Sequence, residues 1–187
     1  MVCDPVLLLD PDHWQQRATS PLSGKDYVFA YLLGHRQENR EIATQVAKGK
    51  ALPLAHIPYV HFRYNRYDAH FGDWTLPHVS PTDFLGLIRD SAYVVTDSYH
   101  GVLFSLIFQR PFVALLRNHQ NESNNMNSRL VDLLTELNLQ DRVVTTPEAV
   151  RRCLQMPIDY PTVNALLTAQ KAHSIAFLEQ ALRREAP

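Results

Sequence analysis

The turn at residues 96–101, of sequence Thr-Asp-Ser-Tyr-His-Gly, holds the side chains best suited to chemistry in this chain. It brings together the carboxylate of Asp97, the hydroxyl of Ser98 and the imidazole of His100, and an apolar stretch that is typical of a helix follows at 102–108. The first N–H groups of a helix are free of intrahelical partners and lie at the positive end of its dipole. The turn therefore predicts a site for an anion such as a phosphate or a carboxylate.

Two interpretations of these side chains stay open. Asp97 or Ser98 could simply cap the helix, because short polar side chains commonly do so. For His100 a functional role is favoured, since the helix that follows is almost wholly apolar and a lone imidazole at its start has no structural explanation. Gly101 carries no side chain and would let a ligand approach the backbone closely.

Two arginines are candidates for holding the anion. Arg117 follows the apolar segment 112–116, on the side of the predicted sheet where the turn lies. Arg129 begins a predicted helix, where a cation opposes the dipole unless it contacts an anion. For both, an ordinary surface position is the alternative. Asn127 closes a polar stretch from residue 118 that is either ordered by a ligand or simply solvated.

The segment Gly34-His35-Arg36 is the third part of the candidate site. It follows the first predicted strand of the sheet, where a glycine can admit a phosphate and Arg36 can contact it. The chain has neither GxGxxG nor GxxxxGK[ST], so dinucleotide-binding and P-loop functions are disfavoured. A GxSxG motif is also absent from the sequence, so a hydrolase triad of that kind is not indicated.

Histidines are concentrated between residues 56 and 78, which raises the question of a metal site. The residues concerned are His56, His61, His70 and His78, with Asp68 and Asp73. Their spacing matches neither a helical pair nor a knuckle of the zinc-binding kind. We therefore predict no metal site, and interpret residues 58–80 as a long packing or substrate-facing loop.

Short apolar segments alternate with helical patterns along the whole chain. Five strands are predicted, at 27–33, 52–57, 93–96, 112–116 and 142–145. Ser80 and Pro81 are typical of a capped helix start, and a long helix is predicted at 161–184. This alternation predicts an α/β fold with a mostly parallel, Rossmann-like sheet flanked by helices.

Composition limits the function further. The 187 residues suffice for one well-buried domain, and 18 basic against 19 acidic residues give a net charge of −1. Such a balance does not draw a chain to nucleic acid or to an acidic membrane.

Cys3 and Cys153 are scattered, so we expect neither a disulfide framework nor a zinc site, with Cys153 packed in the interior. With no apolar run long enough for a membrane span and no signal peptide in the sequence, a cytoplasmic location is expected.

Several segments together resemble the polysaccharide pyruvyl transferase family, specifically its C-terminal half. The matching pieces are residues 4–10, 27–34, 80–85, 92–101, 127–130 and 158–160, together with the closing helix. The resemblance covers nearly the whole chain and is strongest at 80–135. Its most specific element is the Asp-Ser-aromatic-His-Gly turn.

The resemblance implies a fold similar to one half of a GT-B-type transferase, in which two Rossmann-like halves face each other across a cleft. It implies transfer of pyruvate from phosphoenolpyruvate to a sugar in polysaccharide biosynthesis, with no cofactor. The family's donor-site histidine maps onto His100. Many members carry an arginine two residues earlier, where this chain has Ser98, so Arg117, Arg129 or Arg36 is expected to compensate.

The roles implied are specific. His100 is expected to act as a general acid or to stabilise the leaving phosphate, and Asp97 to hold its imidazole in one tautomer. Arg117 and Arg129 are expected to clamp the carboxylate or phosphate, beside Ser98, Gly101, Asn127, Gly34 and Arg36 as donor-binding residues. A nucleotide-sugar glycosyltransferase domain and a non-catalytic donor-binding fragment are the alternatives.

The domain organisation is also an expectation. Residues 1–24 are predicted to be an interdomain segment, and residues 25–187 a single donor-binding domain. The N-terminal half usual in the family is not in this sequence, so a further domain or a second chain is the expected partner, beside phosphoenolpyruvate and the saccharide.

Overall fold

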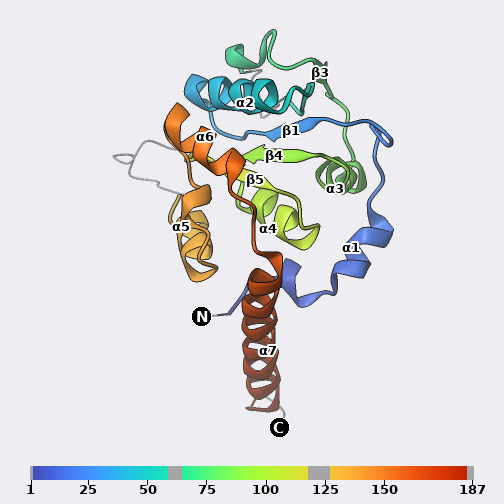
Figure 1. Cartoon of the computed structure of the whole chain (residues 1–187). Coiled ribbons are helices and arrows are strands. Elements are labelled where there is room, and N and C mark those ends of the chain that lie inside the picture. Colours follow the sequence, from blue (N-terminus) through green and yellow to red (C-terminus); the bar gives the residue numbers. More distant parts are fainter. Residues whose placement is uncertain (1, 59–64, 118–126, 185–187) are drawn as a thin grey trace.

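A single parallel sheet forms the centre of the molecule, a computed structural model that describes residues 2–58, 65–117 and 127–184 (Figure 1). The strands are β1 (Val28–Tyr31), β2 (Leu54–His56), β3 (Trp74–Thr75), β4 (Tyr93–Thr96) and β5 (Phe112–Ala114). Their order is β3-β2-β1-β4-β5, and every pair of neighbours is parallel. The predicted α/β fold with a Rossmann-like parallel sheet is confirmed.

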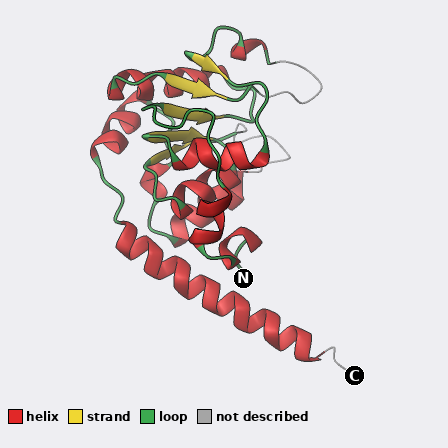
Figure 2. Ribbon diagram, turned by 90° about the vertical axis from the view of Figure 1, so that its right-hand side faces the viewer, coloured by secondary structure: helices red, strands yellow, loops and turns green. Residues whose placement is uncertain are grey.

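Helices connect the strands and cover both faces of the sheet (Figure 2). They are α1 (Pro11–Arg17), α2 (Gln37–Lys50), α3 (Pro81–Arg89), α4 (Tyr99–Ile107), α5 (Asn127–Glu136), α6 (Pro147–Gln155) and α7 (Tyr160–Arg184), with short 3₁₀ turns η1 (Pro5–Leu8), η2 (Arg66–Asp68) and η3 (Gln140–Arg142). The start of α3 is a complete capping box, in which Ser80 and Asp83 each accept from the other's backbone N–H. Such a box satisfies donors that the helix itself leaves free.

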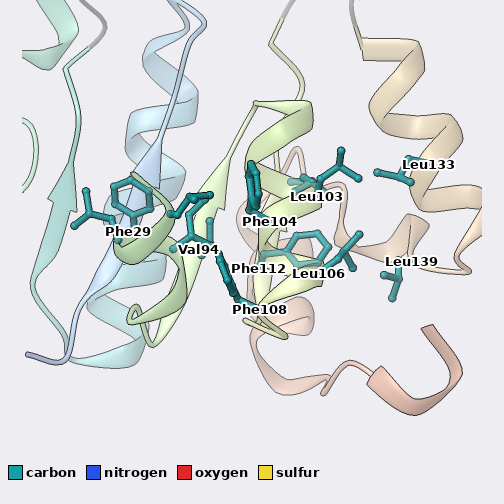
Figure 3. Close-up of a cluster of buried hydrophobic side chains, with 14 of the residues drawn as sticks. Phe29, Val94, Leu103, Phe104, Leu106, Phe108, Phe112, Leu133 and Leu139 are labelled. Atoms are coloured by element: carbon teal, nitrogen blue, oxygen red, sulfur yellow. The ribbon is translucent and has the colours of Figure 1, made fainter. Parts of the chain in front are cut away.

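Alternate strand residues supply two separate cores. Phe29, Val94 and Phe112 face α3, α4 and α5 in the larger cluster (Figure 3). Val28 and Val95 point the other way, into a cluster with α2 and α6. Side chains of a strand point alternately to its two faces, so near-continuous apolar strands such as these are typical of a sheet covered on both sides.

The predicted strand at 142–145 is wrong. Val143 makes one isolated parallel bridge with Ala114 and belongs to no strand. The buried Arg142 guanidinium of η3 donates to the carbonyl oxygen of Cys153 at 3.2 Å, so this segment packs as a turn beneath α6. The fifth strand is instead β3, inside the region interpreted as a loop, where only two residues pair with β2.

The N-terminal segment and α7 lie together on the larger core. Leu7, Ala18 and Leu22 of the first 24 residues are buried in that cluster, as is Val163 of α7. Figure 1 shows the rest of α7 extending away from the sheet as one uninterrupted helix. Ser174 is its last buried residue among those described. Within the described ranges, no helix combines the length and the apolar character that a bilayer crossing requires.

Candidate functional site

The candidate site lies at the C-terminal edge of the sheet, where the strand order reverses. β1 and β4 are neighbours, but the chain leaves β1 towards α2 on one face and leaves β4 towards α4 on the other. Loops that diverge in this way open a crevice beyond the strand ends, which is where open α/β sheets bind ligands. The turn 96–101 and the loop 33–36 are the two sides of that crevice.

Asp97 ties the two sides together. Its buried carboxylate accepts the backbone N–H of Leu33 at 2.7 Å and that of Gly34 at 2.9 Å. Asn39 Nδ2 donates to the same carboxylate at 3.5 Å. Burial raises the pKa of Asp97, and the two backbone donors and the Arg117 guanidinium oppose part of that rise. A carboxylate with these partners fixes the geometry of the loop after β1.

The expectation that Asp97 holds the His100 imidazole is not met. The hydrogen bonds and ion pairs of the Asp97 carboxylate within the described ranges go to Leu33, Gly34, Asn39 and Arg117. The turn sends the Asp97 side chain inward between β4 and β1, whereas the His100 side chain is half exposed on the first turn of α4. Asp97 is therefore a structural anchor of the site, one position before the cap of α4.

Arg117 reaches the turn from the end of β5, as predicted. Its Nη2 donates to the backbone carbonyl of Asp97 at 3.3 Å, and its Nε lies 4.0 Å from Asp97 Oδ1. A Cβ added at Gly34 would sit 2.9 Å from both Asp97 Oδ2 and Arg117 Cγ. Gly34 is thus needed for the close approach of three segments, in addition to any ligand it admits.

A buried ion pair supports the loop after β1 from the other side. Arg40 Nη2 and Nε each lie 2.9 Å from Asp68 Oδ1, and both side chains are almost fully buried. Arg40 Nη1 also donates to the carbonyl of Gly34 at 2.6 Å. The N–H of Gly34 is therefore held by Asp97 and its carbonyl by Arg40, which leaves this loop little freedom. Arg40 was not singled out from the sequence, and Asp68 was considered only as a metal ligand, because the two residues are 28 positions apart.

Ser98, rather than Asp97, caps α4. Its Oγ accepts the N–H of Gly101 at 3.3 Å, and its own N–H donates to Thr96 Oγ1 at 3.1 Å. A Cβ on Gly101 would overlap the Thr96 side chain, so this glycine is needed for packing. The N–H groups of Tyr99 and His100 precede the first intrahelical bonds of α4 and remain available to an anion.

His100 takes part in a charged cluster that the sequence did not reveal. Its Nε2 lies 3.8 Å from Oδ2 of Asp4, and Arg129 Nη2 lies 3.4 Å from the same oxygen. The Arg129 guanidinium also lies 4.3 Å over the ring centroid of Tyr99. The two predicted residues His100 and Arg129 therefore meet through Asp4, which the sequence marked only as part of a resembling segment 96 residues away.

The remaining predicted residues lie around this edge. Arg36 is the N-cap of α2, and its Nε is 3.7 Å from Glu38. Asn127 opens α5, and its Oδ1 accepts the backbone N–H of Arg117 at 2.9 Å. Asn127 thus positions the strand end that carries Arg117, while Arg36, 24% exposed, stays accessible.

The histidine-rich region shows no arrangement of metal ligands where it is described. His56 is buried at the end of β2, with Nε2 3.0 Å from Thr75 Oγ1, and burial lowers its pKa. His70 and His78 are exposed, and His61 lies outside the described residues. Among the described residues no group of three potential ligands could hold a metal ion.

The fold is a Rossmann-like α/β domain of the kind that builds the halves of GT-B transferases, and its candidate site lies at the C-terminal edge of the sheet. The chain belongs to the polysaccharide pyruvyl transferase family, whose sequence profile matches residues 1–119. That range contains both sides of the crevice, the turn 96–101 and the loop 33–36, and also Arg117. No curated protein sequence matches the chain.

Solved structures similar to this chain include a glycosyltransferase and two epimerases. The glycotransferase of kitacinnamycin superimposes with a TM-score of 0.54 at 16% identity, covering 91% of this chain and 46% of that one. The UDP-GlcNAc 2-epimerase of Methanocaldococcus jannaschii, solved with UDP-GlcNAc and UDP, gives 0.47 at 12% identity, covering 88% and 42%. A putative UDP-N-acetylglucosamine 2-epimerase of Listeria monocytogenes gives 0.44 at 16%, covering 87% and 51%. The likeness concerns the fold, and the chain spans about half the length of these proteins.

Proposed function

We propose that this chain is the donor-binding half of an enzyme that transfers a pyruvyl group from phosphoenolpyruvate to a sugar of a polysaccharide or glycan. The observation that carries the proposal is the position of His100 on the first turn of α4, at the crevice where the order of strands reverses. Membership of the polysaccharide pyruvyl transferase family supports the reaction class. The phosphoenolpyruvate donor is part of the proposal.

The anionic donor fits the groups that this edge offers. Phosphoenolpyruvate carries a phosphate and a carboxylate, and two N–H groups at the start of α4 can receive one of them. The Arg117 guanidinium, held against the Asp97 carbonyl, and Arg36 across the crevice can receive the other. A guanidinium binds either group through two parallel hydrogen bonds, which fixes its orientation.

The chemistry needs a proton donor close to the bound ligand. Protonation of the methylene carbon of phosphoenolpyruvate makes its C2 electrophilic, and a sugar hydroxyl adds there with loss of its proton. Inorganic phosphate then leaves with the C–O bonding electrons, and a second hydroxyl closes the cyclic ketal with loss of another proton. His100 is the candidate to deliver the first proton or to stabilise the leaving phosphate, because its imidazole is half exposed on the first turn of α4.

Replacing the imidazole tests that role directly. In a complete two-domain version of the enzyme, His100→Ala should lower turnover by at least ~10²-fold if the ring transfers a proton. Stability should change little, since the side chain is 51% exposed. Lys48→Ala, a change on the distant last turn of α2, serves as the matched control and should keep full turnover. Unchanged turnover of His100→Ala would reject the proton-transfer role.

A nucleotide-sugar glycosyltransferase domain is the second candidate, favoured by the similarity of fold to the glycotransferase of kitacinnamycin. The two candidates differ in the ligand they require. Phosphoenolpyruvate should raise the melting temperature of the chain under the main proposal, and a uridine or guanosine diphosphate sugar under the alternative. A ligand that binds only the folded state stabilises it in proportion to the logarithm of its concentration.

A candidate docking surface for the other half of the proposed enzyme lies on α7. Beyond Ser174 the helix exposes Ile175, Phe177, Leu178 and Leu182, of which Leu182 is 70% exposed. By helical spacing, Phe177 and Leu178 continue the face by which Val163 and Leu167 pack on the domain, and Ile175 and Leu182 lie at one border of that face. An exposed apolar stripe of this kind marks an interaction site, and we assign it to the second Rossmann-like domain, which the lengths of the matched structures suggest.

A further inference from the structure

Beside His100 the surface is hollowed by a cavity of about 320 Å³, between the N-terminal segment, the start of α4, α5 and α7. Its polar lining consists of Asp4, Tyr99, Arg129, Asp132, Glu136 and Gln170. Cavities of this size, with a few convergent polar groups, are typical of sites for small molecules. We propose that this hollow binds the saccharide that accepts the pyruvyl group, an inference that rests on the proposed function.

The charges of the lining decide which ligand fits. Three carboxylates, from Asp4, Asp132 and Glu136, line the hollow against one guanidinium, from Arg129. That guanidinium already lies 3.4 Å from Asp4. A phosphate or carboxylate ligand would be repelled by the remaining negative charge. Hydroxyl groups, by contrast, donate well to carboxylate oxygens, so a neutral, hydroxyl-rich ligand is favoured.

The other lining groups suit a sugar ring and do not suit a metal ion. Gln170 of α7 donates to Glu136 Oε2 at 2.9 Å, which holds two walls of the hollow together. Leu7 and Leu133 add apolar surface for the C–H groups of a sugar. The carboxylates do not converge as metal ligands, since no described group of three residues is placed to hold a metal.

Asp4 connects the hollow to the predicted chemistry. It lines the hollow, and its Oδ2 lies 3.8 Å from His100 Nε2. Tyr99 also lines the hollow and contacts His100, with the two ring centroids 5.7 Å apart. A hydroxyl that donates to Asp4 is therefore held next to the imidazole, where an attacking oxygen must lie. The Asp4 carboxylate is also placed to take the proton that this hydroxyl loses on attack.

Nuclear magnetic resonance of the ¹⁵N-labelled full chain tests this site. Methyl glucoside and methyl galactoside are the neutral probes. Glucuronic acid is the anionic probe, because it carries a carboxylate where glucose has its hydroxymethyl group. The neutral glycosides should shift the amide signals of Cys3, Asp132 and Leu133, and glucuronate should bind at least ~3-fold more weakly because of the added charge. Asp132→Ala should weaken the neutral glycosides by ~3- to 10-fold through loss of a charge-assisted hydrogen bond.

The control variant is Asp26→Ala, which removes an exposed carboxylate outside the hollow and should leave glycoside binding unchanged. The proposal is overturned if neither glycoside shifts these signals, if glucuronate binds as tightly, or if Asp132→Ala has no effect. Addition of phosphoenolpyruvate to the same sample separates the two proposals. Shifts at Ser98–Gly101 without glycoside binding would remove the acceptor site alone, and glycoside binding without those shifts would remove the donor assignment alone.

Discussion

Gly34 and Asp97 meet at the point where the strand order of the sheet reverses: the Gly34 backbone N–H donates to Asp97 Oδ2 at 2.9 Å. The two residues are 63 positions apart in the sequence. Their contact joins the loop after β1 to the turn after β4, and Arg117 packs against both. The candidate site is therefore one connected unit, and its geometry depends on a contact in which His100 takes no part.

Gly34→Ala tests whether this contact shapes the anion site. The added Cβ would lie 2.9 Å from Asp97 Oδ2 and from Arg117 Cγ, so the segments must move apart. We expect a loss of ~1–3 kcal/mol in the free energy of unfolding, which urea titration measures. Phosphoenolpyruvate affinity should fall as well, because Arg117 and the start of α4 are displaced.

Gly86→Ala is the matched control for that experiment. The added Cβ would overlap the backbone of Thr19. Gly86 lies within α3 and is not part of the crevice. We expect a comparable or larger loss of stability with unchanged phosphoenolpyruvate affinity in the fraction that is folded. Equal loss of affinity in both variants would contradict a specific role for Gly34.

Asp97→Asn should change how stability depends on pH. Burial raises the pKa of Asp97 above its ordinary value of 3.8, so the folded state retains this proton at a pH where the unfolded state has released it. The contribution of Asp97 to stability is therefore greatest below the ordinary pKa and declines as the pH rises through the raised value. Asparagine does not titrate and should remove this decline.

The measurement is the free energy of unfolding of both proteins by urea, between about pH 4 and pH 8. The asparagine has a single side-chain oxygen for the two N–H groups of Leu33 and Gly34, so the variant should also be less stable by ~1–3 kcal/mol at low pH. The difference between the two proteins should shrink as the pH rises. A difference that grows with pH would show that the folded state lowers this pKa.

Arg40→Ala tests the ion pair beneath the Gly34 loop. The substitution leaves Asp68 buried without its guanidinium partner, and we expect a loss of ~3–5 kcal/mol in the free energy of unfolding. Arg151→Ala is the control, because its pair with Glu148 has both side chains about two-thirds exposed, at 68% and 67%. An exposed pair contributes ~0.2–1 kcal/mol at most. Similar effects of the two substitutions would contradict the structural role assigned to Arg40.

Leu182→Ser tests the docking surface on α7. Leu182 is 70% exposed, so in the isolated chain the substitution should change the free energy of unfolding by no more than ~0.5 kcal/mol. Val163→Ala, at a residue 2% exposed on the same helix, should cost ~2 kcal/mol. In a protein that also contains the proposed second domain, Leu182→Ser should become destabilising as well. An unchanged stability there would show that this stripe does not contact the second domain.

Local sequence patterns predicted the parts of the fold that depend on neighbours in the chain. The helix cap at Ser80, the buried strand at 93–96 and the polar turn before α4 all follow from spacing within a few residues, and all are confirmed. The buried position of Cys153 is also confirmed. Placing the turn at the C-terminal edge followed from the rule for parallel sheets.

Contacts between distant segments could not be predicted in this way. The apolar residues Val143 and Val144 have the pattern of a strand, but the buried guanidinium of Arg142 donates to a carbonyl of α6, and this segment makes a single bridge to β5. β3 was missed because two residues carry no periodicity. Asp4 and His100 meet across 96 positions, and Asp97 turns away from the neighbouring imidazole to bind Gly34. Side-chain direction at such positions is set by tertiary packing.

The central claim, that the edge between β1 and β4 is an anion site for phosphoenolpyruvate, is tested most directly by a crystal structure of the chain with this ligand. We expect one anionic group to accept hydrogen bonds from the N–H groups of Tyr99 and His100 at the start of α4, with the Arg117 guanidinium turned towards the ligand. Phosphoenolpyruvate bound elsewhere, or a crevice that stays empty at saturating ligand, would contradict it.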